Sequence, residues 1–148
     1  NITVCCVGED NHVRAEMARS ELELLKMLED NGITGAITSS SPMEFIEKHL
    51  SAVNLLHRFQ KLCSGHEVPN GKPAPDIYLK AAAMIGLQPE QCLAVEDSPA
   101  GILSASRAGC LPVYVPDQAP ADEETMQLLY AHADSLLDII TMIEEEQP

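Results

Sequence analysis

The stretch CLAVEDSPAGILSASRAG (Cys92–Gly109) joins a short apolar segment to a helix-like segment through two acidic residues, a serine and a proline. The apolar residues before the acids predict a short buried strand. Pro99 suits the first turn of a helix, while Arg107 and Gly109 suit its last turn and the residue after it. A strand that leads directly into a helix is the repeating unit of a parallel α/β sheet.

The same alternation of short apolar segments and amphipathic segments runs through most of the chain. It predicts an α/β fold, a Rossmann-like parallel sheet flanked by helices. Ligands bind at the carboxyl ends of the strands in such sheets, so we expect the chemistry there. The predicted strands are residues 33–38, 59–63, 92–95 and 111–115, and the predicted helices are residues 20–31, 42–50, 75–85, 99–108, 122–131 and 135–145.

Composition limits the partners and the compartment. The 148 residues carry a formal net charge of −14, which argues against nucleic-acid and anionic-membrane partners because both require a basic surface. The apolar runs are shorter than the roughly 20 residues of a membrane-spanning helix. The five cysteines form no CxxC pair, so we expect free thiols in a reducing, cytoplasmic compartment.

Two segments near predicted strand ends suit phosphate. Ser39 and Ser40 follow a predicted strand and precede a helix, where a hydroxyl and free backbone amides can bind an anion. These serines could instead simply cap the helix. Lys72 lies in the loop Gly71-Lys72-Pro73-Ala74-Pro75, whose prolines stiffen the backbone and could aim the ammonium at a phosphate. The alternative is a solvated surface lysine.

Glu96 and Asp97 end the predicted strand with two adjacent carboxylates. Carboxylates in a low-dielectric cleft require a cation, and Mg²⁺ prefers carboxylate and phosphate oxygens. The alternative is that Asp97 caps the following helix while Glu96 is solvated.

Three segments resemble motifs of the haloacid dehalogenase superfamily of hydrolases, most closely its beta-phosphoglucomutase-like branch: AITSSSP (Ala36–Pro42), GKPAPDIYLKAA (Gly71–Ala82) and LAVEDSPAGILSASRAG (Leu93–Gly109). The resemblance covers roughly residues 20–133. It implies a Mg²⁺-dependent phosphatase or phosphosugar mutase that acts on a small phosphorylated metabolite, such as a sugar phosphate.

The resemblance also implies a role for each site residue. Ser39, Lys72 and Asp97 would be catalytic. Ser39 would hydrogen-bond the phosphoryl oxygens with help from the Ser40 amide, and Lys72 would bridge the phosphoryl group and the nucleophilic carboxylate. Asp97 would bind Mg²⁺ directly, and Glu96 directly or through water.

The family's first motif, an Asp-x-Asp-Gly signature that supplies the nucleophile, does not occur in this sequence. The nearest candidate is Gly8-Glu9-Asp10. We therefore expect the central first strand and the helical cap to be missing, with residues 1–19 an N-terminal segment or cap remnant and residues 20–148 the core domain. The chain would be a fragment of an enzyme or, alternatively, an inactive phosphate- or metal-binding module that acts through partners.

Overall fold

The computed structural model of the chain describes residues 3–8, 30, 32–40, 42–52, 61–96, 98–115, 122–133, 138 and 141. Within these residues, six parallel strands form one sheet in the order β3-β2-β1-β4-β5-β6. The strands are β1 (Thr3–Gly8), β2 (Ala36–Ser39), β3 (Lys61–Ser64), β4 (Cys92–Glu96), β5 (Leu111–Tyr114) and β6 (Ala131–His132). The predicted α/β fold class with a parallel sheet is confirmed.

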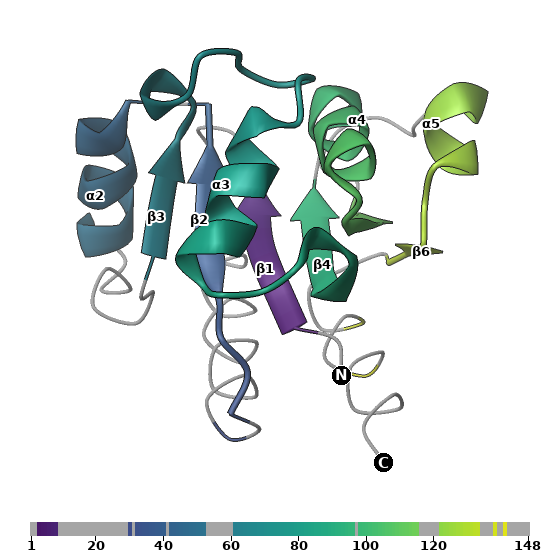
Figure 1. Cartoon of the computed structure of the whole chain (residues 1–148), viewed down its shortest axis with the longest axis horizontal. Coiled ribbons are helices and arrows are strands. Elements are labelled where there is room, and N and C mark those ends of the chain that lie inside the picture. The colour runs from purple at the N-terminus through teal and green to yellow at the C-terminus, as the bar shows by residue number, and fades with distance from the viewer. Residues whose placement is uncertain are drawn as a thin grey trace.

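Helices connect these strands. They are α2 (Met43–Ala52), α3 (Asp76–Met84), α4 (Pro99–Ala108) and α5 (Glu123–Gln127), with short 3₁₀ turns η2 (Gly65–Glu67) and η3 (Pro89–Gln91). Helices α3 and α4 lie side by side over one face of the sheet (Figure 1). None of the helices in the described ranges is long and apolar enough to cross a membrane.

Strand β1 occupies the middle of the sheet, between β2 and β4. We expected this central row to be missing, and the structure instead places Thr3–Gly8 there. The segment TVCCVG does not alternate between polar and apolar residues. A strand that is covered on both faces lacks this alternation, whereas a half-exposed strand shows it. The predicted boundary at residues 19 and 20 and the predicted cap remnant, apart from β1, lie outside the described residues.

The end of the chain differs from the prediction. We expected one helix over residues 122–131, but α5 ends at Gln127 and Ala131–His132 form strand β6. The Tyr130 amide donates to the Pro112 carbonyl, and the Ala133 amide donates to the Tyr114 carbonyl. A strand of two residues is too short for its pattern to be read from sequence. The predicted helix at residues 135–145 lies almost entirely outside the described residues.

Small side chains let α3 and α4 pack closely on the sheet. The core between them contains three cysteines and five alanines together with two larger side chains, Ile77 and Tyr78, all buried. Close packing of this kind keeps α3 near β1, β2 and β3 and keeps α4 near β4 and β5, because small residues leave little space between layers. The cluster consists of Cys63, Ile77, Tyr78, Ala81, Ala82, Cys92, Ala94, Ala105, Ala108 and Cys110.

Candidate active site

The carboxyl ends of three strands each place a polar or acidic residue at the same edge of the sheet. Ser39 ends β2, Ser64 ends β3 and Glu96 ends β4. The chain adds β2 and β3 on one side of β1, and β4, β5 and β6 on the other. Ligands of open α/β sheets bind where the strand order reverses in this way. Here that point lies at β1, between Ser39 and Glu96.

A buried ion pair forms at this edge between Lys72 and Glu96. The Lys72 ammonium donates to Glu96 Oε1 at 2.5 Å, and the two side chains are only 8% and 1% exposed. Burying one charge alone is costly, so a lysine and a glutamate at this depth stabilise each other as charged groups. The solvated alternatives that the sequence left open for Lys72 and Glu96 are therefore wrong.

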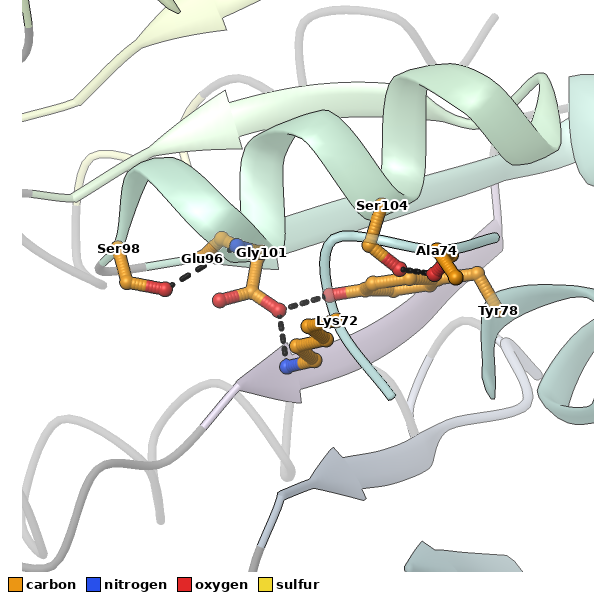
Figure 2. Close-up of polar contacts among 7 residues, drawn as sticks. All are labelled: Lys72, Ala74, Tyr78, Glu96, Ser98, Gly101 and Ser104. Atoms are coloured by element: carbon orange, nitrogen blue, oxygen red, sulfur yellow. Dashed lines mark hydrogen bonds and ion pairs between the residues drawn. The ribbon is translucent and has the colours of Figure 1, made fainter. Parts of the chain in front are cut away.

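Tyr78 completes this pair from helix α3. Its hydroxyl donates to Glu96 Oε1, the same oxygen that accepts from Lys72. Its ring lies beneath the Lys72 ammonium, with 5.5 Å between the nitrogen and the ring centroid, a distance at which a cation is attracted to the ring face. Figure 2 shows the tyrosine hydroxyl and the lysine ammonium meeting at one glutamate oxygen.

The start of helix α4 makes room for the Glu96 carboxylate. Ser98 is the N-cap of α4, and its side chain accepts from the Gly101 amide at 3.2 Å. The alternative in which Asp97 caps this helix is therefore wrong. A Cβ atom at Gly101 would lie 2.0 Å from Glu96 Oε2, so only glycine fits against the carboxylate.

Helix α4 also holds the loop that carries Lys72. The buried Ser104 hydroxyl donates to the Ala74 carbonyl at 2.6 Å, and Arg107 Nη1 donates to the Pro73 carbonyl at 3.2 Å. The loop carbonyls are thus tied to a helix about thirty residues further along the chain. This anchoring, together with the two prolines, keeps the lysine backbone in place.

The serine segment lies on the other side of β1. Ser39 is 4% exposed and pairs in register with Ser64, while Ser40 is exposed. Gly65 packs closely on this segment, since a Cβ atom there would lie 3.2 Å from Ser40 Cα. With neighbouring strands about 4.8 Å apart, β2 and β4 are separated by roughly 10 Å. This spacing leaves the width of β1 between Ser39 and the Lys72–Glu96 pair.

Glu96 is the one carboxylate of the predicted Mg²⁺ site that lies among the described residues. Its Oε1 already accepts hydrogen bonds from Lys72 and Tyr78 at this edge of the sheet. No group of three or more His, Cys, Asp or Glu side chains suited to a metal occurs within the described part of the chain. Asp97, the predicted direct ligand, lies outside it. The carboxylate chemistry suits Mg²⁺, but a site requires Asp97.

The sequence did not reveal the parts played by Tyr78 and Gly101. Tyr78 is one of three tyrosines in the chain. A buried tyrosine usually has a hydrogen-bond partner for its hydroxyl, and this was the available signal for its role. Gly101 could have been noticed as a glycine inside a helix, where glycine is unfavourable without a packing reason. Neither signal names Glu96 as the partner.

Comparison with known proteins identifies the family. A model of haloacid dehalogenase-like hydrolases matches residues 7–109, which is more than half of the chain. The chain belongs to this family. The superfamily predicted from the three motifs is thereby confirmed, and beta-phosphoglucomutases are among the solved structures that share the fold.

Two curated haloacid dehalogenase relatives are phosphatases by name. "Probable pseudouridine-5'-phosphatase" of Drosophila melanogaster is 35% identical over 141 residues, covering 90% of this chain and 58% of that protein. Hexitol phosphatase A of Escherichia coli (strain K12) is 39% identical over 101 residues, covering 68% of this chain and 45% of that protein. This chain therefore spans about half the length of these relatives.

A solved structure gives the same view of the haloacid dehalogenase fold. A family hydrolase from Deinococcus radiodurans R1, determined with bound phosphate and sodium, is 25% identical with a TM-score of 0.77. The match covers 88% of this chain and 62% of that chain. The similarity thus covers most of this chain, while the other protein is longer than the matched part.

Proposed function

We propose that this chain provides the phosphate-binding and charge-neutralising part of a Mg²⁺-dependent phosphoryl-transfer site. The observation that carries the proposal is the buried Lys72–Glu96 pair at the edge where the strand order reverses. A buried lysine on a tethered loop is a preorganised cation, and preorganised charge is the main source of catalysis in phosphoryl transfer. Family membership supports the same chemistry.

Each predicted residue has a proposed role on this chain. The Ser39 hydroxyl and the Ser40 amide would donate to phosphoryl oxygens from the β2 side. Lys72 would donate to the same phosphoryl group from the β4 side and offset its negative charge. The roughly 10 Å between β2 and β4 is enough for a phosphate with donors on both sides. The carboxylate that receives the phosphoryl group would come from an Asp-x-Asp-Gly motif, which this sequence does not contain.

The metal assignment rests on adjacent carboxylates. Asp97 would hold Mg²⁺ directly, and Glu96 would contribute directly or through a water molecule. When bound, the ion would neutralise charge on the phosphoryl oxygens. Since Oε1 of Glu96 is occupied by Lys72 and Tyr78, its contribution would come through Oε2.

The proposed substrate is a small phosphorylated metabolite, such as a sugar phosphate. The two named relatives are phosphatases for pseudouridine-5'- and hexitol phosphates by name, which supports this class. The net charge of −14 supports a small anion neutralised by local donors over a nucleic acid or an anionic membrane. The described cysteines Cys63, Cys92 and Cys110 are free thiols, which supports the proposed cytoplasmic location.

Hydrolysis of an aryl phosphate tests the proposal. The 148-residue chain would be assayed with p-nitrophenyl phosphate in Mg²⁺ and in EDTA, beside Asp97→Asn as a control for contaminating phosphatases. Binding of inorganic phosphate and of Mg²⁺ would be measured by calorimetry on the same samples. We expect Mg²⁺ binding that Asp97→Asn weakens, and phosphate binding that Lys72→Ala weakens. A folded chain that does not bind phosphate would refute the proposal, and one that binds phosphate but not Mg²⁺ would refute its metal assignment.

The missing motif favours one alternative, a phosphate- and metal-binding module without catalysis that acts through partners. Both functions use Ser39, Lys72 and Asp97, so binding does not distinguish them. Beryllofluoride bonds to a carboxylate that can accept a phosphoryl group and mimics the resulting acyl phosphate. Tight Mg²⁺-dependent beryllofluoride binding would support the enzyme, and its absence in a chain that binds phosphate would support the module.

A further inference from the structure

We propose that Tyr78 is a positioning residue that holds Glu96 in place when Lys72 turns toward a bound phosphate. This inference rests on the proposed function, because it concerns how the same lysine is released to its ligand. It assigns the Tyr78 hydroxyl a part in phosphate binding without contact to the phosphate.

Lys72 and Tyr78 share one hydrogen-bond acceptor. Both donate to Glu96 Oε1, the lysine at 2.5 Å from the loop and the tyrosine from helix α3. The other carboxylate oxygen lies against Gly101, where even a methyl group would come within 2.0 Å. The carboxylate therefore has little room to turn and find another donor on that side.

A bound phosphate would compete with Glu96 for Lys72. In the structure the Lys72 ammonium is committed to Glu96, with 8% of the side chain exposed. A phosphate at the edge would attract the same ammonium. Each hydrogen bond that Lys72 gives to the phosphate weakens its bond to Glu96, which is 1% exposed and cannot turn to water instead. A buried carboxylate left without donors carries a large penalty.

Tyr78 removes this penalty. Its hydroxyl keeps donating to Oε1 while the ammonium shifts, so the glutamate retains one hydrogen bond throughout. Its ring lies 5.5 Å beneath the ammonium and offers a weak, nondirectional attraction that tolerates a shift. Tyr78 itself is fully buried in the core under α3, so its hydroxyl does not follow the lysine.

Tyr78→Phe removes the hydroxyl and keeps the ring. In this variant Lys72 would be the remaining donor to Oε1, and phosphate would have to compete against it. We expect inorganic phosphate to bind about tenfold or more weakly, in keeping with the loss of a hydrogen bond to a charged group. Tyr130→Phe, at a tyrosine that is 42% exposed, is the matched control and should bind phosphate as the wild type does.

A spectroscopic readout separates positioning from a structural role. The chain has three tyrosines and no tryptophan, so tyrosine absorbance can be followed without interference. Saturating phosphate should change the tyrosine difference spectrum of the wild type and of Tyr130→Phe, since the cation above the Tyr78 ring moves. The change should be absent from Tyr78→Phe. A structural role would lower the thermal midpoint but would give the wild type no phosphate-dependent signal.

The outcomes distinguish this inference from the proposed function. Weaker phosphate binding in Tyr78→Phe together with the wild-type spectral change supports the inference. Equal binding in a folded Tyr78→Phe, or no spectral change in a wild type that binds phosphate, overturns the inference and leaves the proposed function standing. If the wild type does not bind phosphate, both are overturned. Where Tyr78→Phe does not fold, the lack of a phosphate-dependent change in the wild-type spectrum still overturns the inference.

Discussion

Replacing Gly101 with alanine should disrupt the buried pair without altering any charged residue. The new Cβ would lie 2.0 Å from Glu96 Oε2, 2.1 Å from Cδ and 2.5 Å from Oε1. Cβ contacts below 3.0 Å are essentially never seen, so the carboxylate must move by about 1 Å or more. Its Oε1 is hydrogen-bonded to Lys72 at 2.5 Å and to Tyr78, and a shift of this size breaks or weakens both bonds.

The free-energy cost follows from two opposing effects. Breaking a buried ion pair costs about 3–5 kcal/mol when one partner is left uncompensated. Alanine is favoured over glycine within a helix by up to about 1 kcal/mol. Gly101→Ala should therefore lower the free energy of unfolding by about 2–4 kcal/mol. For a domain of this size that is a large part of the total stability.

Urea denaturation followed by circular dichroism measures this difference. Glu96→Ala provides the internal test, because it removes the carboxylate that the new methyl group would strike. Gly101→Ala should be neutral or stabilising by up to about 1 kcal/mol in the Glu96→Ala background. If Gly101→Ala is as stable as the wild type, or if it costs the same with and without Glu96, the steric reasoning is wrong.

Three further perturbations test the surroundings of the site. Ser104→Ala removes the 2.6 Å hydrogen bond to the Ala74 carbonyl and should lower the unfolding free energy by about 1–2 kcal/mol in urea titrations, with Ser106→Ala as the partly buried control. Burial raises the pKa of the Cys63 thiol from 9.0 to about 11, so the unfolded chain loses this proton first. Stability should fall as the pH rises from 9 to about 11, and Cys63→Ala should flatten that part of a pH series of thermal melts. Hydrogen bonds from the Thr125 side chain and amide lower the pKa of the Asp122 carboxyl. The ionised carboxylate should therefore stabilise the fold above pH 3.8, and this contribution should be lost as the pH falls below that value. Asp122→Asn should weaken this acid dependence in the same thermal melts.

Much of the fold was predictable because local signals agreed with one another. Around β4 and α4, an apolar run, a proline and a C-terminal glycine all indicated the same boundaries, and α4 begins and ends where they predicted. Gly109 adopts a φ of 95°, which glycine tolerates and which explains the helix end. Where signals were short, as in β6, the prediction failed because pairing with β5 decides the structure of those residues.

Lys72 and Glu96 could be predicted from the sequence as site candidates, but their contacts could not. Strand ends and the loop motif pointed to Lys72 and Glu96, and the structure brings these two together. Residue type and spacing do not tell which donors a carboxylate meets, since Tyr78 is 18 residues away from Glu96 in the chain. The glycine requirement at position 101 depends on a side chain from another element. Both features depend on how the helices pack against the sheet, which the sequence does not specify locally.

The tethering of the Lys72 loop to α4 limits how the protein can be recombined with its relatives. The carbonyls of Pro73 and Ala74 are held by side chains that lie 34 and 30 residues later in the sequence. A chimera that exchanges only the loop would place the backbone of another protein opposite Arg107 and Ser104, and their hydrogen bonds to the loop carbonyls could be lost. An exchange designed to keep the lysine in position would have to move the loop and α4 as one cassette, so the useful crossover points lie before Gly71 and after Gly109.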